Sequence, residues 1–525
     1  MASSELAVIL TLLAFGLVLY TVFTKNNSTP AHLPPGPKGL PLLGNVHQLP
    51  VAYQEKAFAE WGKKYGGLIY AKIFRTSALI VNSFEIAHDL MDKRSPNYSD
   101  RPRFVLLNEL LGWDSTLAPM RYTPQYRKQR KWVQDAFLVK STLATYRPIQ
   151  HREASVALAG LLTTPETFKD HFARFAAATI MEIAYGHRVT SNDDPYVRMA
   201  QEATLETALA GSPGSMLADF FPILKQMPTW MPGSGFKTNA LRVRGIIRQV
   251  LDIPYNKVKA NMESGTAGPS ITSVLLEKSF RHGTLKDDEE DIKGAAGGLY
   301  GAGTESTTTM LTTFIMAMLR HPEVLAKAQE EMDRVVGSDR LPDFDDRKSL
   351  PYLEAILIEL YRYHTPIPLG VPHRVTADDE YHGFHLPAGS MVIANIWGMS
   401  QVEEYYPEPD QFRPERYIGI DKATMDTIDP RNYVFGFGRR ICPGRDFADI
   451  GIFLVMSQIL ATMDIQRAKD KSGKEIIPDF EFTSGFASHP KAFHCEIRPR
   501  SRKAINLISQ MNIGNEFVEI PVIAS

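Results

Sequence analysis

The spacing of apolar residues along the chain is that of a mainly helical protein. From about residue 84 onward apolar positions recur at helical intervals, and the same spacing covers residues 52–65. Two stretches differ, because residues 68–74 and 78–82 are rich in strand-forming residues and lie close enough together for a hairpin. A second strand-rich stretch covers residues 380–396. We therefore predict a mainly α fold with a small β lobe.

Residues 211–235 interrupt the helical series with Pro, Gly, Met and aromatic residues. This composition suits a mobile apolar loop, and it suits a loosely packed connection between two helices equally well. No shift in composition marks a second domain between residue 46 and about residue 500. With 525 residues, 44% of them hydrophobic, the chain can bury a large core.

An uncharged apolar run covers residues 6–24, near the N-terminus. As a helix these 19 residues would measure roughly 28 Å, close to the hydrocarbon thickness of a bilayer. A cleaved signal peptide is the alternative, but the run is long for one and no basic segment precedes it. Glu5 lies before the run, whereas Lys25 and Lys38 follow it. We therefore expect residues 1–25 to form a single transmembrane helix in contact with lipid, with the body of the protein in the cytosol.

A proline-rich segment follows the expected anchor. Residues 33–45 include four prolines, which restrict φ and remove backbone donors, so this stretch can form neither a helix nor a central strand. We expect a stiff linker over residues 26–50 that holds the body at a fixed distance from the membrane. The body then covers residues 51–505, and residues 506–525 form a C-terminal tail.

Charge and cysteine content narrow the function. The chain has 58 Lys and Arg against 59 Asp and Glu, a net charge of −1, which removes any global electrostatic case for binding nucleic acid. The two cysteines are Cys442 and Cys495, too few for a disulfide framework. A cysteine this scarce in a glycine-rich loop calls for a chemical explanation.

A long helix is predicted to begin near the acidic run at residues 287–291 and to end near Arg320, a length of roughly 50 Å. Four glycines in its middle are costly unless something must approach the backbone there. Glu305 stands beside Ser306 and Thr307, and an acid next to hydroxyls can relay protons. The alternative is a small-residue patch for helix packing.

A second helix carries Glu359 and Arg362 on one face. The same Glu-x-x-Arg spacing recurs at Glu331 and Arg334, so the pair alone has little weight. Arg416 lies further on, in a proline-limited loop. A buried Glu between two Arg would form a structural clasp, because buried ion pairs fix geometry more than they add stability.

The loop at residues 435–444 delivers Cys442 to the start of a helix predicted over residues 450–460. Gly438 permits positive φ, and Gly444 lets the chain approach a flat ligand closely. A zinc site would need three or four ligands, and no second cysteine or histidine lies nearby in sequence. Ligation of haem iron by a single thiolate fits better.

The pattern Phe-x-x-Gly-x-Arg-x-Cys-x-Gly stands at Phe435, Gly438, Arg440, Cys442 and Gly444. This motif resembles the cytochrome P-450 family, of the microsomal (class II) fungal type, similar to O-methylsterigmatocystin oxidoreductase-like monooxygenases. The other motifs follow in the family's order, so that the resemblance covers residues 33–500. It implies the cytochrome P-450 fold, the endoplasmic reticulum membrane as location, and haem b as cofactor.

The resemblance also implies roles for individual residues. Cys442 would be the axial iron ligand, with Phe435, Gly438 and Gly444 shaping its loop against the haem. Glu359, Arg362 and Arg416 would form the clasp behind the haem. Positions that match those binding the haem propionates are Arg440, His373, Arg130 and, more weakly, Arg101, together with Tyr126, which stands where the family usually has tryptophan.

The family's oxygen-activating segment is matched at residues 302–306, with Ser306 in place of the commoner threonine. The resemblance implies that Ser306 or Thr307 donates a hydrogen bond where oxygen reacts, while Glu305 passes protons. It implies electrons from a separate NADPH-cytochrome P-450 reductase. The basic residues that could dock it, or that simply form a solvated surface, are Arg127, Lys128, Lys131, Arg439 and Arg445.

Three function classes stay open. The first is a monooxygenase that uses dioxygen to hydroxylate or epoxidise a lipophilic small molecule, in secondary metabolism or xenobiotic oxidation. The second is a haem-thiolate isomerase or dehydratase, and the third is a non-catalytic haem sensor. By family analogy the pocket is lined by residues near 101–122, 211–235, 299–304, 367–370 and 483–486, which leaves the substrate itself undetermined.

Overall fold

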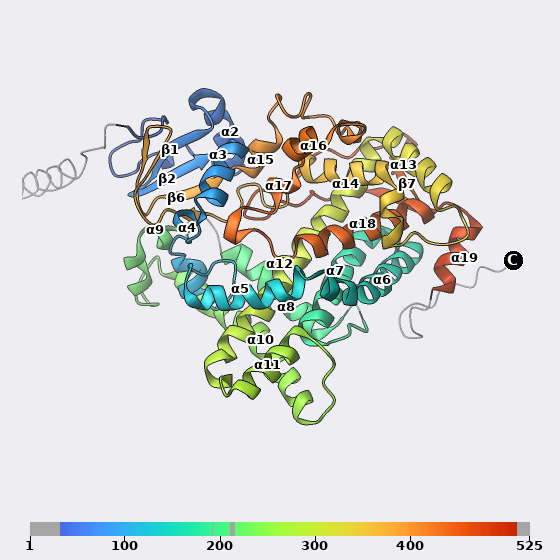
Figure 1. The fold of residues 1–525 in the computed structure, drawn as a ribbon, viewed down its shortest axis with the longest axis horizontal. Coiled ribbons are helices and arrows are strands. Elements are labelled where there is room, and N and C mark those ends of the chain that lie inside the picture. Colours follow the sequence, from blue (N-terminus) through green and yellow to red (C-terminus); the bar gives the residue numbers. More distant parts are fainter. Residues whose placement is uncertain (1–31, 192, 211–215, 512–525) are drawn as a thin grey trace, which may run out of the picture.

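The computed structural model describes residues 32–191, 193–210 and 216–511. The anchor expected at residues 1–25 lies outside the described residues. Within the described ranges, no helix is both long enough and apolar enough to cross a membrane. Figure 1 shows a mainly helical body with a small strand-containing lobe formed mostly by the N-terminal part of the chain. The predicted fold class is confirmed in these respects.

The elements agree with the helical and strand spacings in the sequence. The α-helices are α2 (Gln54–Tyr65), α3 (Phe84–Ala87), α4 (Ser95–Tyr98), α5 (Pro124–Phe137), α6 (Lys140–Thr163), α7 (Phe168–Tyr185), α8 (Pro195–Ala210), α9 (Leu217–Phe220), α10 (Gly235–Glu263), α11 (Ile271–His282), α12 (Leu285–Arg320), α13 (Pro322–Val335), α14 (Pro351–Tyr363), α15 (Ile396–Ser400), α16 (Lys422–Ile428), α17 (Arg431–Val434), α18 (Arg445–Thr462) and α19 (Arg502–Gln510). The strands are β1 (Leu68–Ile73), β2 (Thr76–Val81), β3 (His373–Arg374), β4 (Asp379–Tyr381), β5 (Phe384–Leu386), β6 (Met391–Ala394), β7 (Met463–Arg467) and β8 (Cys495–Pro499). Short 3₁₀ or π turns are η1 (Val46–Gln48), η2 (His88–Lys93), η3 (Val105–Leu110), η4 (Pro165–Thr167), η5 (Pro222–Gln226), η6 (Phe344–Ser349), η7 (Pro414–Tyr417) and η8 (Gly438–Arg440).

The β lobe joins two distant parts of the chain. Its four-stranded sheet has the order β1-β2-β6-β3, in which β1 and β2 form the predicted hairpin. Strand β6 pairs with β2 in parallel and with β3 in antiparallel orientation. The strand-rich stretch predicted at residues 380–396 supplies β6 and most of the two-stranded sheet β4-β5. This sheet carries β3, and with it His373, toward the site described below.

The proline-rich segment after residue 32 is packed against the β lobe. The carbonyl oxygen of Pro35 accepts the amide of Tyr70 at 3.0 Å, and the amide of Asn45 donates to Lys72 at 2.6 Å. A Cβ added at Gly36 would lie 1.9 Å from the carbonyl oxygen of Tyr70. The segment therefore lies along β1, and its lack of regular structure follows from its prolines.

Helix α12 is the centre of the molecule (Figure 1). Its 36 residues correspond to roughly 54 Å, as the acidic start and the apolar pattern predict. Residues 292–300 belong to one hydrophobic core, shared with α5, α7, α8, α10 and α11. Residues 310–319 belong to a second core, shared with α6, α13, α14 and α18. One helix thus connects both cores.

Several glycines of α12 are explained by close packing. A Cβ at Gly294 would lie 1.9 Å from the carbonyl oxygen of Ser115, and one at Gly297 would lie 2.3 Å from the side chain of Leu251. At Gly301, by contrast, the nearest atom would be 3.9 Å away. Close packing therefore requires glycine at Gly294 and Gly297. It does not explain the glycine at Gly301.

The C-terminal end of the described chain is helical. Helix α19 starts at Arg502 and is capped by the hydroxyl of Ser501, which accepts the amide of Ala504 at 3.1 Å. Ile508 is fully buried, and α19 packs against α6 and α18. The boundary predicted at residue 505 falls inside this helix.

Substituting two glycines of α12 tests the packing argument. Gly294→Ala should lower the free energy of unfolding by about 1–3 kcal/mol, because the backbone carbonyl of Ser115 cannot move aside cheaply. Gly301→Ala is the matched control and should stabilise by up to about 1 kcal/mol through helix propensity. Urea unfolding of both variants measures this difference, and equal effects would contradict the packing explanation.

Candidate active site

The loop before α18 carries Cys442 and is closed by its own backbone. The amide of Cys442 donates to the carbonyl oxygen of Phe435 at 2.7 Å. Gly436 and Gly438 adopt positive φ, at 79° and 53°, so that the chain can turn back on itself. Helix α18 begins at Arg445, which places the thiol just before a helix N-terminus, as predicted.

Gly438 has a second reason to be glycine. A Cβ there would lie 2.1 Å from the carbonyl oxygen of Met91, and its amide donates to the carboxylate of Asp92. The turn η2 thus fixes the thiol-bearing loop from outside. At Gly444 an added Cβ would meet no protein atom within 4 Å, so the approach of a flat ligand stays a prediction there.

The Cys442 thiol lies in a mixed electrostatic environment. Burial raises its pKa, whereas a backbone hydrogen bond from Gly444 and the guanidinium groups of Arg130 and Arg445 lower the pKa. In the described part of the chain, no group of three or more His, Cys, Asp or Glu side chains is placed to hold a metal ion. Ligation by one thiolate is the arrangement that these residues offer.

Four buried basic side chains, here called the basic cluster, converge near this loop from different elements. Each is only 4–8% exposed. The cluster consists of Arg101 from the segment after α4, Arg130 from α5, His373 from β3 and Arg440 from η8.

The basic cluster has no carboxylate of its own. Among the described residues none of its members forms an ion pair with Asp or Glu, and Nη1 of Arg440 and Nε of Arg130 lack any hydrogen-bond partner. The carbonyl oxygens that hold the cluster belong to Ala118, Val371 and Pro372 for Arg101, and to Ser99 and Met120 for Arg440.

The pKa values of the basic cluster indicate that it lacks an anionic partner. Burial and the neighbouring Arg440 lower the pKa of Arg101 to about 9. Burial also lowers the pKa of Arg130, of Arg440 and, to well below its usual value, of His373. Buried cations are costly without an anion, so a dianionic group is the natural complement. The two propionates of haem b fit this requirement.

His373 and Tyr126 are placed differently from the two orphaned guanidinium groups. Nδ1 of His373 lies 2.7 Å from the carbonyl oxygen of Tyr98, so Nε2 is the nitrogen left for a ligand. A nearby carboxylate would favour its protonation. The hydroxyl of Tyr126 donates its one proton to the carbonyl oxygen of Arg439 at 2.8 Å. The ring of Tyr126 instead supports Arg440, whose Cζ lies 3.7 Å from its centroid.

Helix α12 presents an accessible face at the predicted oxygen-activating segment. Ala302 is exposed and Ser306, one turn later, is half-buried, although the helix is otherwise largely buried. The Ser306 hydroxyl donates to the carbonyl oxygen of Ala302 at 2.9 Å. Thr307 lies on another face and is 7% exposed. The structure therefore separates the two hydroxyls that the sequence offered together.

Helix α12 packs directly against α18, the helix that follows the thiol-bearing loop, and also against α7. A Cβ at Gly303 would lie 2.9 Å from the side chain of Ile180 on α7. Sequence reasoning missed one residue here, since His489 approaches Glu305 from a distant loop.

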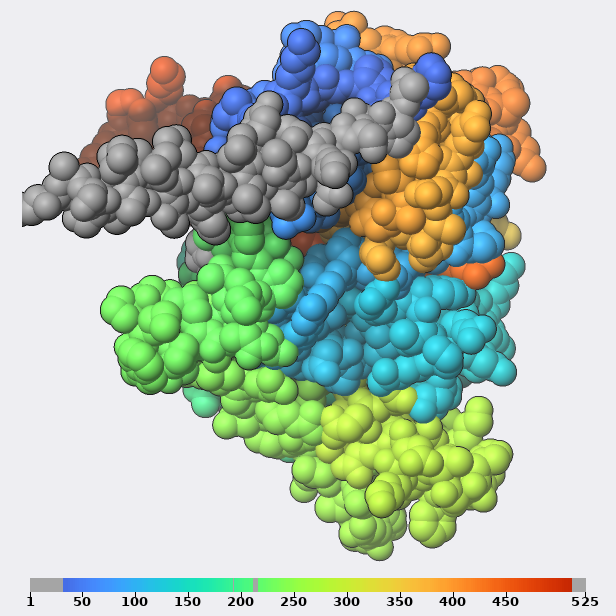
Figure 2. Space-filling model, turned by 90° about the vertical axis from the view of Figure 1, so that its left-hand side faces the viewer, coloured from blue at the N-terminus to red at the C-terminus, as the bar shows by residue number. Residues whose placement is uncertain are grey.

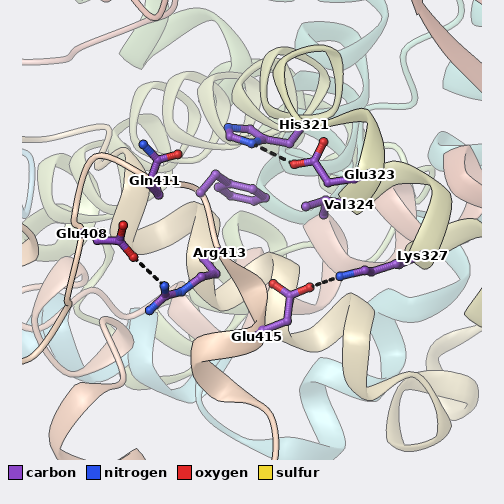
Figure 3. Close-up of a pocket in the computed structure, with 9 residues that line it drawn as sticks. His321, Glu323, Val324, Lys327, Glu408, Gln411, Arg413 and Glu415 are labelled. Atoms are coloured by element: carbon purple, nitrogen blue, oxygen red, sulfur yellow. Dashed lines mark hydrogen bonds and ion pairs between the residues drawn. The ribbon is translucent and has the colours of Figure 1, made fainter.

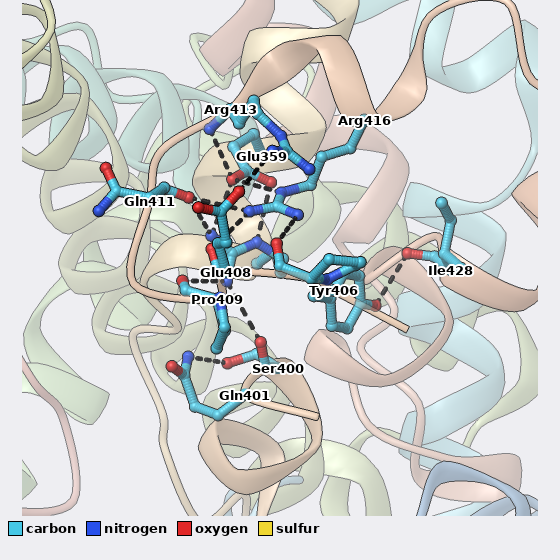
Figure 4. Close-up of polar contacts among 12 residues, drawn as sticks. Glu359, Ser400, Gln401, Tyr406, Glu408, Pro409, Gln411, Arg413, Arg416 and Ile428 are labelled. Carbon is cyan, nitrogen blue, oxygen red and sulfur yellow. Dashed lines mark hydrogen bonds and ion pairs between the residues drawn. The ribbon is translucent and has the colours of Figure 1, made fainter. Parts of the chain in front are cut away.

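The contacts of the predicted clasp are present (Figure 4). Arg362 donates to both carboxylate oxygens of Glu359, at 2.8 and 2.7 Å, and Nε of Arg416 lies 3.2 Å from the same carboxylate. The amide of Arg413 adds a fourth bond, at 2.9 Å. Glu359 and Arg362 are inaccessible to solvent.

The clasp joins α14 to η7 and to the segment just before it. The guanidinium groups of Arg362 and Arg416 each also donate to three backbone carbonyls, and they share that of Gln411. Burial alone would lower the pKa of Arg362, but the carboxylate of Glu359 raises it. Every guanidinium N–H direction of Arg362 has a hydrogen-bond acceptor. A buried ion pair repays its loss of hydration only under this condition.

Comparison with known proteins identifies the family. The family model for cytochrome P-450 matches residues 34–496. The chain belongs to the cytochrome P-450 family. Cytochrome P-450 monooxygenase 176 of Postia placenta is 47% identical over 92% of this chain and 93% of its own. Monooxygenase 136 of the same fungus is 44% identical over 98% and 97%, and cytochrome P-450 monooxygenase claR of Ampulloclitocybe clavipes is 40% identical over 94% and 91%.

Membership of this family makes the protein a haem-thiolate enzyme. P-450 enzymes bind haem through a cysteine thiolate. Here Cys442 offers the thiolate, and the basic cluster offers positive charge for the two propionates. P-450 monooxygenases use dioxygen and a redox partner to act on small molecules. The predicted family, enzyme class and cofactor are thereby confirmed.

The basic residues proposed for partner docking divide into three kinds. Lys128 forms ion pairs with Asp288 and Asp291 of α12, so its charge is already neutralised inside this P-450. Arg127 and Lys131 on α5 are exposed, and no ion pair of either is found among the described residues. The remaining two have local contacts, Arg439 with the hydroxyl of Tyr122 at 3.2 Å and Arg445 with Asp446 at 3.4 Å.

A surface pocket of about 280 Å³ borders the clasp (Figure 3). Its carboxylates are paired within the pocket. The pairs are Glu323 with His321, Glu408 with Arg413 and Glu415 with Lys327. Of these contacts, that between Lys327 and Glu415 links α13 to η7, and the other two are local, so each carboxylate of the pocket already has a partner in the fold.

Spectroscopy of the haem-loaded protein tests the assignment of Cys442. The reduced carbon monoxide complex should show the red-shifted Soret band of thiolate ligation, and Cys442→Ser should abolish that shift. Cys495→Ser is the matched control and should retain it. A normal Soret position in the unaltered protein would contradict ligation by Cys442.

Two arginines at equal spacing from a glutamate test the clasp. Arg362→Ala should lower the free energy of unfolding by about 3–5 kcal/mol, because it leaves the buried carboxylate of Glu359 uncompensated. Arg334→Ala changes the other Glu-x-x-Arg pair, where the arginine is exposed, and should have little effect. Urea unfolding distinguishes the two, and similar losses would refute the structural role of the clasp.

Proposed function

We propose that this P-450 inserts one oxygen atom from dioxygen into a C–H or C=C bond of a lipophilic small molecule. The observation that carries the proposal is the accessible face of α12, where Glu305 adjoins Ser306 beside Ala302. An acid next to a hydroxyl suits proton delivery to a reacting oxygen, which a haem-thiolate isomerase or dehydratase does not need. Three similar fungal proteins that are named monooxygenases support the same reaction.

The protein's own groups would bind, orient and move protons. When bound, haem would supply the redox chemistry of dioxygen activation, with the thiolate of Cys442 as its electron-donating ligand. The basic cluster would pair with the propionates and thereby fix the plane of the ring. The Ser306 hydroxyl can accept one proton while it releases its own, so it can pass protons from Glu305 without a lasting change of charge.

We assign the proton-passing hydroxyl to Ser306 and not to Thr307. Ser306 follows Ala302 by one helical turn and shares its accessible face. Thr307 lies about 100° further round the helix and is buried. Serine keeps the hydroxyl of the family's usual threonine but lacks its methyl group, which leaves more room beside the reacting atoms.

A lipophilic substrate and a membrane location are supported by the surface around α9. Ile223 and Trp230 are 73% and 79% exposed. Phe74, in the β1-β2 turn, contacts the rings of Phe220 and Phe221, with centroids 5.4 and 4.9 Å apart, and so joins this region to the β lobe. Figure 2 shows the green surface of this region beside the blue N-terminal lobe.

The exposed apolar side chains of these two regions form what we call the apolar surface. Its members are Leu40, Leu42, Leu43 and Val51 from the N-terminal segment and Met216, Leu217, Phe221, Ile223, Trp230 and Met231 from the region around α9. Exposed apolar area on this scale suits a lipid surface. We propose that it rests on the endoplasmic reticulum membrane, next to the anchor expected at residues 1–25.

We propose that the electron donor is a separate, membrane-bound NADPH reductase. Arg127 and Lys131 leave exposed positive charge on α5, the helix that also carries Arg130 of the basic cluster. Such a patch would steer an acidic partner toward the haem. Since Lys128 is already paired, it should contribute little to docking.

Incubation with a reductase tests the proposed reaction. Microsomes that contain this P-450 and an NADPH reductase are given a panel of lipophilic metabolites under isotopically heavy dioxygen. Mass spectrometry should find a product that has gained one heavy oxygen atom, only when NADPH is present. A product that is isomerised or dehydrated without added oxygen would refute the proposal.

Single substitutions of the two hydroxyls control that experiment. Ser306→Ala should divert electrons to hydrogen peroxide and lower the product formed per NADPH by roughly tenfold or more. Thr307→Ala removes the neighbouring buried hydroxyl and should retain most of the coupling, which is the product formed per NADPH consumed. The reverse pattern would show that the hydroxyl has been assigned to the wrong residue.

A further inference from the structure

The loop between residues 483 and 489 lies against α12 beside the proposed proton-transfer segment. Its two ends are held together, because the amide of Thr483 donates to the carbonyl oxygen of His489 at 2.8 Å and the Thr483 hydroxyl accepts the amide of His489 at 2.9 Å. The amide of Ser488 also donates to the carbonyl oxygen of Pro366 at 2.8 Å. The loop is therefore a fixed support for the side chain of His489.

Both ring nitrogens of His489 contact α12. Nε2 lies 3.3 Å from a carboxylate oxygen of Glu305, and Nδ1 lies 2.5 Å from the hydroxyl oxygen of Thr309. Glu305 and Thr309 are one turn apart, so the imidazole spans one turn of the helix. Thr309 is 1% exposed, whereas the side chains of Glu305 and His489 remain 44% and 36% exposed.

The partners determine which nitrogen of neutral His489 carries the proton. Nε2 faces a carboxylate, which only accepts protons in hydrogen bonds, so the neutral imidazole is expected to carry its proton on Nε2. Nδ1 then accepts the hydroxyl proton of Thr309. Burial lowers the pKa of His489, and Lys169 acts in the same direction, while the carboxylate of Glu305 raises it. The imidazole is thus held in one tautomer and aimed at the acid.

We propose that His489 positions Glu305 for proton transfer, with Thr309 fixing the imidazole. Glu305 is a flexible side chain on an accessible face, and the 3.3 Å contact with an imidazole on a fixed loop limits the orientations it can adopt. The second carboxylate oxygen stays free to exchange protons with water or with Ser306. The inference rests on the proposed function, because it assumes that Glu305 delivers protons to the reacting oxygen.

Substitution of His489 tests the proposal in the haem-loaded protein with its reductase. His489→Ala should lower the product formed per NADPH by about tenfold and raise the solvent deuterium isotope effect, because the acid loses its support. His489→Gln, whose amide can still donate to Glu305, should restore part of the coupling. Lys491→Ala breaks an exposed ion pair with Glu481, which flanks the loop on both sides, and is the control for loop damage.

A second measurement does not depend on turnover. The C–O stretching frequency of the reduced carbon monoxide complex responds to polar groups near the ligand, so His489→Ala and Thr309→Val should both shift it while haem content stays unchanged. Lys491→Ala should leave the frequency where it is. Coupling and frequency that are unaffected by His489→Ala would overturn the proposal.

Glu305→Gln distinguishes failure of the positioning role from failure of the proposed function. If Glu305→Gln uncouples the enzyme and His489→Ala does not, His489 has no positioning role and the acid role of Glu305 stands. If neither substitution changes coupling, the acid role fails and the positioning role fails with it. If both single variants lose coupling and the double variant loses no more, Glu305 and His489 act in the same proton-transfer pathway.

Discussion

Buried positive charge without a carboxylate partner is the constraint on which this site depends. Arg101, Arg130, His373 and Arg440 come from four separate elements, and burial disfavours the charged form of each. Burying these positive charges costs free energy unless hydrogen bonds to backbone carbonyl oxygens or a bound anion compensate for the lost hydration. The carbonyl oxygens satisfy part of this demand, and the orphaned Nη1 of Arg440 leaves the remainder for the cofactor.

The rest of the structure holds these groups and the thiol in fixed relation. The clasp around Glu359 ties α14 to the segment before η7, and Met91 and Asp92 brace the thiol-bearing loop at Gly438. Helix α12 crosses both hydrophobic cores, so its accessible face cannot shift without disturbing them. A redox site needs this rigidity, because proton transfer depends on small distances between reacting groups.

Much of this architecture could be predicted from local sequence. The hairpin, the long helix and the helix after the cysteine follow from apolar spacing, and the motif around Cys442 led to the family. Assignments that depended on what a side chain contacts were less complete. Lys128, expected on a docking surface, is neutralised by α12, and Tyr126 donates its hydroxyl proton to Arg439. The proline-rich segment packs on β1, which its composition could not reveal.

The sequence by itself determined the fold class, the family and the residue types available for chemistry, because periodicity and spacing are local properties of the chain. Only the tertiary structure decided which of those residues meet. It separated Ser306 from Thr307 by helical face, left the basic cluster without a carboxylate, and brought His489 to a hydroxyl 180 residues away. Contacts between distant segments arise from packing of the whole core, and no local pattern records them.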